Sequence, residues 1–169
     1  MHDLHLDDNY ILHNIILHYT FVKNLKVNKM KTIYSIGATV QGGRNGRVKS
    51  ENGVLDIDVR MPKALGGAND DFANPEMLFA AGYAACFDSA LNLIIKQAKI
   101  KTGETSVTAH VSIGQIENGG FGLSAELHAN IPGVTSEQAQ ELVEKAHAVC
   151  PYSNATRGNM EVKLTVSNN

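Results

Sequence analysis

The chain has 169 residues, of which 43% are hydrophobic and 19% charged, and its formal net charge is −2. This length and composition are typical of one globular domain with its own hydrophobic core. The absence of a basic surplus argues against nucleic-acid binding, and two cysteines are too few for a secreted disulfide framework or a four-thiolate zinc site.

The first 29 residues differ from the rest of the chain, because they hold four of the seven histidines and none of the 15 glycines. Acidic residues stand where a secretory signal needs basic ones, and the apolar patch at 11–22 is short and broken by polar side chains. We therefore expect neither export nor membrane insertion but a cytoplasmic protein. We interpret residues 1–29 as a flexible or marginally helical extension, residues 30–169 as the domain, and Met30 as the natural start.

Two strands are predicted before the first long helix. Residues 31–40 are rich in β-branched side chains, and residues 54–60 alternate between apolar and polar. The segment GGRNGR between them contains an Asn-Gly pair, which is a strong turn signal. Arg44 is therefore expected at or beside the tip of a hairpin.

The stretch from Asn74 to Lys99 predicts a long central helix. Asn74 is a good N-cap, Pro75 suits the first helical position, and Glu76 places a negative charge at the positive helix end. Apolar residues occupy nearly every face, so we expect burial on all sides, and polar residues interrupt the run too early for a bilayer span. The small residues at 80–85 favour close packing against another helix, such as the same helix of a partner subunit.

The second half predicts a hairpin, a second helix and a last strand. Residues 106–117 and 121–131 alternate around an Asn-Gly-Gly turn, and Thr135 begins a capping box followed by helical periodicity up to Cys150. Residues 159–167 have the pattern of a strand. The order ββ-α-ββ-α-β, joined by hairpins, predicts an α+β fold with mainly antiparallel sheets around the long buried helix.

The two cysteines are the candidate reactive groups. A reactive thiol needs a nearby cation or a helix N-terminus, and Cys86 lies about three turns inside its helix. A cation must therefore reach it: Lys96 and Lys99 are local, and Arg44 could arrive through the fold. Cys150 lies at a helix C-terminus, where the dipole disfavours a thiolate, so it is the more plausible second thiol. On periodicity alone, both could be ordinary core cysteines.

Three segments carry a family resemblance: GGRNGR (42–47), NPEMLFAAGYAACF (74–87) and AVCPYSNATRGN (148–159). They resemble the motifs of the organic hydroperoxide resistance (Ohr) branch of the OsmC/Ohr family. The resemblance extends over residues 30–166, includes the GGFGL hairpin at 119–123, and implies the OsmC/Ohr-like fold.

The resemblance also implies a function. Cys86 would be the peroxidatic cysteine, Cys150 the resolving one, and Arg44 with Glu76 the charged pair that orients and activates Cys86. The implied activity is reduction of alkyl and fatty-acid hydroperoxides through a sulfenic acid and then a disulfide. A lipoyl dithiol, on a lipoylated protein or as dihydrolipoamide, would restore the thiols without metal, haem or flavin. Such a peroxidase would act in the response to oxidative stress.

Helix geometry adds a constraint on this site. Glu76 and Cys86 are ten positions apart, which is about 15 Å along a straight helix. Either the helix breaks, near Pro75 or Gly82, or Glu76 comes from another subunit. We favour the second possibility, an intertwined homodimer with active sites at the interface. We also expect an Arg44–Glu76 ion pair and a contact between Arg44 and Cys86.

Apolar side chains near these motifs are candidates for binding an organic substrate, although they could equally be core residues, Phe79 and Phe87 especially. They are Phe72, Met77, Phe79, Phe87 and Tyr152. Two other functions compete. One is a metal site of Cys86, Cys150 and His147, which lacks a short-spaced ligand pair. The other is a non-catalytic carrier of apolar ligands with a structural disulfide.

Overall fold

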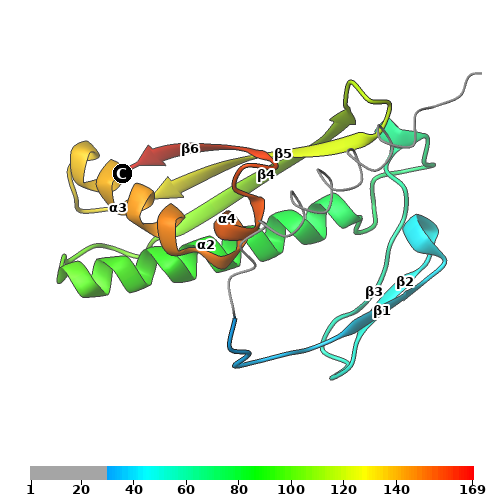
Figure 1. Cartoon of the computed structure of the whole chain (residues 1–169), viewed down its shortest axis with the longest axis horizontal. Helices are drawn as coiled ribbons and strands as arrows, with labels where there is room; N and C mark the ends of the chain where they lie inside the picture. The colour runs from blue at the N-terminus through cyan, green and yellow to red at the C-terminus, as the bar shows by residue number, and fades with distance from the viewer. Residues whose placement is uncertain (1–29) are drawn as a thin grey trace, which may run out of the picture. The chain divides into compact units, whose positions relative to one another are not determined.

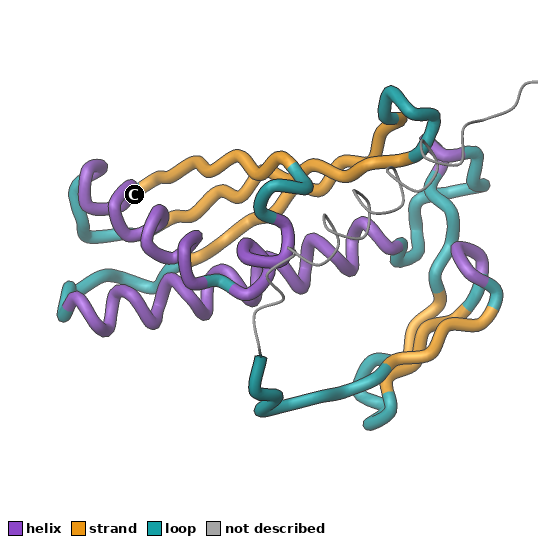
Figure 2. The backbone as a smooth tube through the Cα atoms, viewed as in Figure 1, coloured by secondary structure: helices purple, strands orange, loops and turns teal. Residues whose placement is uncertain are grey.

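The structure is a computed structural model that describes residues 30–169, so the expectations for residues 1–29 lie outside the described part. Residues 37–169 form one compact unit, which holds all the described helices and strands. Residues 30–37 have no regular secondary structure, so the predicted strand at 31–40 begins only at Ala38. Figures 1 and 2 show the elements in order along the chain.

The first sheet contains three short antiparallel strands in the order β1-β2-β3. Their bounds are β1 (Ala38–Gln41), β2 (Arg47–Ser50) and β3 (Asp56–Asp58). The predicted hairpin at GGRNGR is confirmed, but its second strand is β2, which the prediction missed. The signal was a second Asn-Gly pair at 52–53: Asn52 Oδ1 accepts hydrogen bonds from the Ser50 hydroxyl (2.7 Å) and the Val54 amide (3.2 Å), turning the chain into β3.

The central helix α2 (Pro75–Ala98) begins as predicted. Asn74 Oδ1 accepts from the Met77 amide at 2.8 Å, and Pro75 occupies the first turn. The helix is unbroken, so a break between Glu76 and Cys86 is excluded.

The expected burial of α2 on all sides is wrong for the single chain. Tyr83, Phe87 and Leu91 are fully buried, whereas Met77 and Leu93 are half exposed. The small residues Ala81 and Ala85 lie on the exposed side as well. Within the described part, α2 alone has the length and hydropathy of a membrane-crossing helix, a test that core helices of globular proteins also pass. One apolar face of this helix is therefore left uncovered.

The second sheet has the order β4-β5-β6. The predicted hairpin is confirmed as β4 (Ser106–Gln115) and β5 (Phe121–Asn130). The last strand, β6 (Glu161–Ser167), runs parallel to β5, so the expectation of hairpins instead of crossovers is wrong for this strand. A parallel pair needs a crossover, which α3 (Ser136–Val149) and α4 (Pro151–Thr156) supply.

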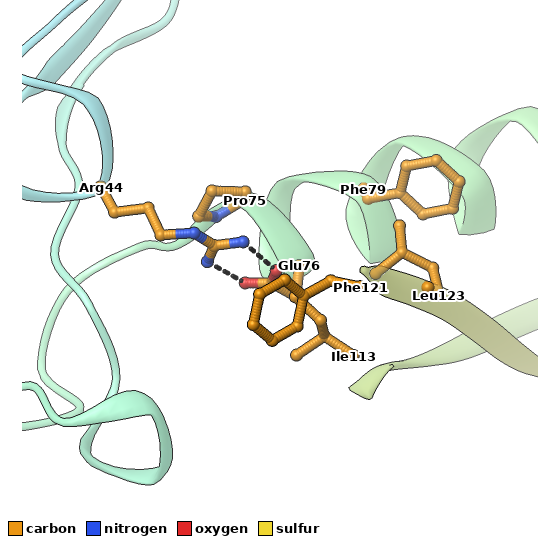
Figure 3. Close-up of a pocket in the computed structure, with 8 residues that line it drawn as sticks. Arg44, Pro75, Glu76, Phe79, Ile113, Phe121 and Leu123 are labelled. Atoms are coloured by element: carbon orange, nitrogen blue, oxygen red, sulfur yellow. Dashed lines mark hydrogen bonds and ion pairs between the residues drawn. The ribbon is translucent and has the colours of Figure 1, made fainter. Parts of the chain in front are cut away.

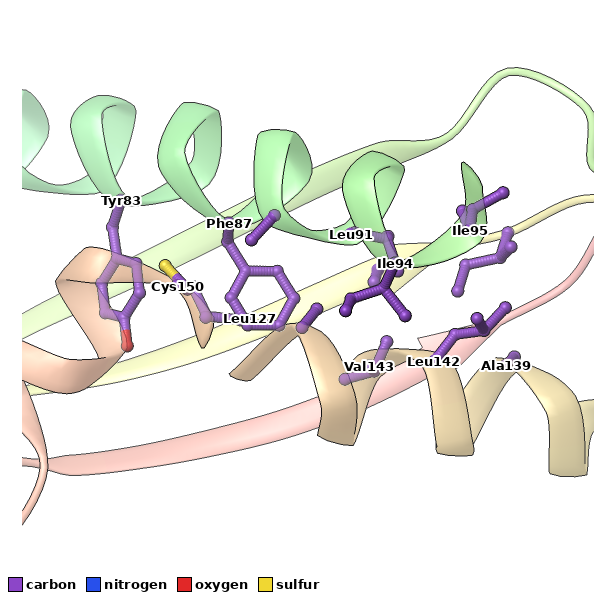
Figure 4. Packing of buried hydrophobic residues seen from close by; sticks show 14 of the residues in the cluster. Tyr83, Phe87, Leu91, Ile94, Ile95, Leu127, Ala139, Leu142, Val143 and Cys150 are labelled. Carbon is purple, nitrogen blue, oxygen red and sulfur yellow. The ribbon is translucent and has the colours of Figure 1, made fainter. Parts of the chain in front are cut away.

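The core lies between the second sheet and the helices α2 and α3 (Figure 4). Side chains from β5, α2 and α3 interdigitate there, among them Leu127, Leu91 and Leu142. The predicted capping box of α3 is confirmed, because Thr135 and Gln138 each bond the other's backbone amide, at 3.2 and 3.0 Å. Cys150 is fully buried at the edge of this core, at the junction between α3 and α4.

Candidate active site

The fold brings the two cysteines together although 64 positions separate them. Cys150 Sγ lies 3.7 Å from Cys86 Sγ, and both thiols are free. Cys86 lies on α2, and Cys150 is both the C-cap of α3 and the N-cap of α4. Pro151 stops α3 because it has no amide proton to continue the helical hydrogen bonds, and it starts α4 instead. The Cys-Pro sequence therefore places Cys150 at a bend between two helices, where its side chain faces α2.

Within one chain, the surroundings of Cys86 favour the protonated thiol over the thiolate. Burial raises its pKa and the neighbouring Cys150 raises it too, while the backbone N–H of Tyr152 acts in the opposite direction. No cationic side chain of the described residues contributes to the pKa of this thiol. The predicted local cations, Lys96 and Lys99, are exposed at the far end of α2.

Arg44 and Glu76 form the predicted ion pair (Figure 3). The guanidinium donates two parallel hydrogen bonds to the carboxylate, at 2.8 and 2.6 Å. The hydrogen bond from Arg44 lowers the pKa of Glu76 despite its partial burial, and the same bond raises the pKa of Arg44. The pair is therefore ionised across the whole neutral range.

Hydrogen bonds to the segment after β3 hold the turn that carries Arg44. Arg44 lies in the 3-10 turn Gly43–Asn45, whose entry uses positive φ at Gly42 and Gly43. Arg60 Nη1 donates to the Gly46 carbonyl at 2.8 Å, and Asn45 Oδ1 accepts from the Met61 amide at 3.2 Å. The turn is thus tied to the segment that follows β3.

An apolar pocket of about 280 Å³ opens beside this ion pair (Figure 3). Phe79 lines it, and its role as a substrate contact stays a prediction. Ile113 and Leu123, which face each other across the β4–β5 hairpin, line it too, together with Phe121. These three hairpin residues were not predicted as part of a site. Their only signal in the sequence is the alternating pattern, which does not tell which end of the helix the hairpin approaches.

The other candidate substrate residues lie in different places. Phe72 is stacked under Arg60, whose guanidinium carbon is 4.9 Å from the ring centroid. Met77 is half exposed in a neighbouring groove, and Phe87 is fully buried in the core. Tyr152 is 38% exposed and packs its ring on Phe79, with centroids 6.0 Å apart.

The charged pair and the thiol pair are separate within one chain. Because α2 is unbroken, Glu76 and Cys86 lie about 15 Å apart along its axis. Among residues 30–169, neither Arg44 nor Glu76 hydrogen-bonds to a thiol, so the expected contact between Arg44 and Cys86 is not made within the chain.

The metal-site alternative is not supported by the geometry. Within the described part of the chain, no three His, Cys, Asp or Glu side chains form a group that could hold a metal ion. His147, its third candidate ligand beside the two cysteines, packs against Phe87, with ring centroids 6.4 Å apart. Its Nδ1 atom is buried without a hydrogen-bond partner, and burial, then Arg157, lowers its pKa.

Comparisons with known proteins agree with the motifs. The OsmC-like protein family matches residues 67–165. An organic hydroperoxide resistance protein of Xanthomonas axonopodis pv. citri (strain 306) is 51% identical over 138 residues, which are 81% of this chain and 96% of that protein. The chain belongs to the OsmC family, in its organic hydroperoxide resistance branch.

Solved structures of the Ohr branch have the same fold. A crystal structure of an organic hydroperoxide resistance protein from Elizabethkingia anophelis, with thiocyanate bound, has a TM-score of 0.80 at 81% identity and covers 83% of this chain and 100% of that one. OhrB of Bacillus subtilis has a TM-score of 0.73 at 43% identity and covers 80% of this chain and 100% of that one. The predicted Ohr resemblance and α+β fold are therefore confirmed.

Proposed function

We propose that this Ohr protein is a thiol-dependent peroxidase that reduces organic hydroperoxides, alkyl and fatty-acid ones among them, to alcohols. The observation that carries the proposal is the 3.7 Å separation of two free thiols from distant parts of the chain. A disulfide has an S–S bond of about 2 Å, so a shift of less than 2 Å closes it. The names of the relatives, organic hydroperoxide resistance proteins, support the substrate class.

The chemistry needs only thiols. The Cys86 thiolate attacks the terminal oxygen of ROOH, the O–O bond breaks, and the leaving alkoxide takes up a proton to become the alcohol. Cys86 then carries a sulfenic acid. The sulfur of Cys150 attacks the Cys86 sulfur, the S–S bond forms, and the S–O bond breaks with release of water.

A second copy of the chain would complete the site. In the proposed homodimer, Arg44 and Glu76 of one subunit lie beside Cys86 of the other. Three observations support it: the unbroken α2, the exposed apolar face of that helix, and a Cys86 thiol whose pKa is lowered by no cation among residues 30–169. Arg44 would lower the pKa of that thiol and so supply the thiolate that the first step requires.

The pocket beside the ion pair suits an organic substrate. Phe79, Ile113 and Leu123 offer apolar surface to the organic group, while Arg44 offers hydrogen bonds to the peroxide oxygens. Hydrogen peroxide has no apolar part and would gain nothing from these side chains. Preference for organic over hydrogen peroxide follows from this arrangement.

Regeneration requires two electrons and two protons from a dithiol. We propose a lipoyl group, on a lipoylated protein or as dihydrolipoamide, as the reductant, and a cytoplasmic role in the response to oxidative stress. A dithiol reduces the Cys86–Cys150 disulfide by exchange and leaves as its own cyclic disulfide.

Turnover of cumene hydroperoxide and of hydrogen peroxide, with dihydrolipoamide as reductant, tests the proposal. We expect fast turnover of the organic substrate, slower turnover of hydrogen peroxide, and none with Cys86→Ser. Equal turnover by Cys86→Ser would show that Cys86 is not the thiol that attacks the hydroperoxide. If neither peroxide is consumed, the remaining function is a carrier of apolar ligands, which the same pocket could hold without turnover.

A further inference from the structure

A buried chain of hydroxyl groups joins α2 to the short helix that follows Cys150. Tyr83 Oη lies 3.0 Å from Ser153 Oγ and 3.3 Å from Thr156 Oγ1, and both Tyr83 and Ser153 are fully buried. Thr156 Oγ1 donates in turn to the Tyr152 carbonyl at 3.0 Å. Each hydroxyl carries one proton, so Thr156 accepts from Tyr83, and Tyr83 accepts from Ser153.

The linked hydroxyl groups lie equally close in sequence to each of the two thiols. Tyr83 precedes Cys86 by three residues on α2, and Ser153 follows Cys150 by three residues on α4. Residues three apart lie on the same face of a helix. The hydroxyl chain therefore connects the two backbone segments that carry the thiols, about one helical turn from each sulfur.

Sliding of α4 along α2 would break the hydrogen bonds between these hydroxyl groups. The Ser153 hydroxyl has no other side-chain partner among the described residues, and a buried hydroxyl without a partner is costly. The outer side of the same segment is held by Arg157, which donates to the His147 carbonyl at 2.8 Å and to Asn154 Oδ1 at 2.7 Å. These contacts give the polar side chains of Ser153, Thr156 and Arg157 a role in holding the segment that follows Cys150.

We propose that Tyr83, together with Ser153, is a positioning residue for closure of the Cys86–Cys150 disulfide. It holds the Cys150 segment against α2, so that the sulfur of Cys150 stays within reach of Cys86. The role in turnover rests on the proposed function, because closure must compete there with attack of a second hydroperoxide on the Cys86 sulfenic acid, which yields a sulfinic acid and the alcohol. The effect on the thiol pair itself does not depend on that function.

The first experiment measures the disulfide without any peroxide. Three proteins are equilibrated with mixtures of reduced and oxidised dithiothreitol: wild type, Tyr83→Phe and Tyr34→Phe. Tyr34→Phe is the matched control, because it removes the same kind of hydroxyl from a side chain that is 73% exposed. Alkylation and mass spectrometry then give the fraction of protein with the Cys86–Cys150 disulfide. We expect the equilibrium constant for closure to fall about 5- to 10-fold in Tyr83→Phe, as for loss of one buried hydrogen bond, and to stay unchanged in the control.

The second experiment measures the competition during turnover. Reduced protein receives increasing cumene hydroperoxide, and mass spectrometry counts Cys86 as disulfide or sulfinic acid. Tyr83→Phe should give more sulfinic acid at the same peroxide concentration, at an unchanged rate of first attack. A purely structural loss would lower the melting temperature without moving this ratio in the folded protein.

Ser153→Ala keeps the inference testable if Tyr83→Phe does not fold, because it removes the same bond from the other side. A folded variant with the wild-type closure constant and the wild-type product ratio would overturn the inference. A wild-type protein that consumes no hydroperoxide would instead overturn the proposed function, and the dithiothreitol equilibrium would still decide the role of Tyr83.

Discussion

Glu76 and Cys86 lie on one unbroken helix, ten positions and about 15 Å apart, and Glu76 holds Arg44 at its own end of that helix. The cation that would activate the thiol is therefore fixed away from the thiol of its own chain. A charged pair with this geometry serves Cys86 only if a second subunit brings its own pair to that sulfur.

Mixing two inactive variants tests this shared site. Arg44→Ala leaves Cys86 intact, and Cys86→Ser leaves the Arg44–Glu76 pair intact. In a mixed dimer one of the two sites regains both, so random mixing should restore about a quarter of wild-type turnover, measured with cumene hydroperoxide after denaturation and joint refolding.

The control is each variant refolded alone, which should stay inactive. A mixture as inactive as its components, although mass spectrometry of the intact complex shows mixed dimers, would place each complete site within one chain and contradict the shared arrangement.

Loss of the Arg44 charge should also change the pH at which the Cys86 thiol reacts. Within one chain, burial and Cys150 raise the pKa of Cys86, so Arg44→Ala should leave a thiol that reacts with iodoacetamide only at alkaline pH. Wild type should react at a lower pH, because the neighbouring cation favours the thiolate. Arg44→Lys, which keeps the charge but not the two parallel bonds, should fall between them. Identical alkylation profiles for wild type and Arg44→Ala would show that Arg44 does not activate the Cys86 thiol.

The parts of this arrangement that sequence could predict depend on local signals. Asn74 and Pro75 mark the start of α2 because caps act within one turn, and the Ohr motifs located Cys86 and Cys150. Strand β2 was missed because its four residues, RVKS, include one apolar side chain, Val48, which is too few for an alternating pattern. The side of α2 that stays exposed, and the approach of Leu123 to the ion pair, follow from contacts between distant segments that no local pattern encodes.

The ion pair should make stability depend on pH in an acidic window. Arg44 lowers the pKa of Glu76 below its ordinary value of 4.5, so the folded state binds the proton less readily than the unfolded state. The stabilisation is fully present above pH 4.5 and is lost as the pH falls through the lowered pKa. Urea unfolding at pH 7 should therefore show Glu76→Gln less stable than wild type by about 1 kcal/mol, the upper range for a partly exposed pair.

The difference between wild type and Glu76→Gln should shrink steadily below pH 4.5. Glu141→Gln is the matched control, because Glu141 pairs with Lys145 at 2.6 Å but on the exposed surface of α3, where the effect should be smaller. A difference between wild type and Glu76→Gln that stays constant from pH 7 to pH 3 would mean that the carboxylate charge does not stabilise the fold.

The apolar pocket should set the preference for organic substrates. Leu123→Ser removes apolar surface opposite Phe79 without touching the thiols or the ion pair. Burial of a leucine-sized apolar group is worth about 1.5 kcal/mol, so kcat/KM for cumene hydroperoxide should fall about tenfold, mainly through KM. The value for hydrogen peroxide should not change, because that substrate has no apolar part to bind. Ile116→Ser, at a half-exposed position of the same hairpin outside the pocket, is the matched control and should keep wild-type kinetics. Equal losses for the two peroxides in Leu123→Ser would show that the hairpin supports the site as a whole and does not select the substrate.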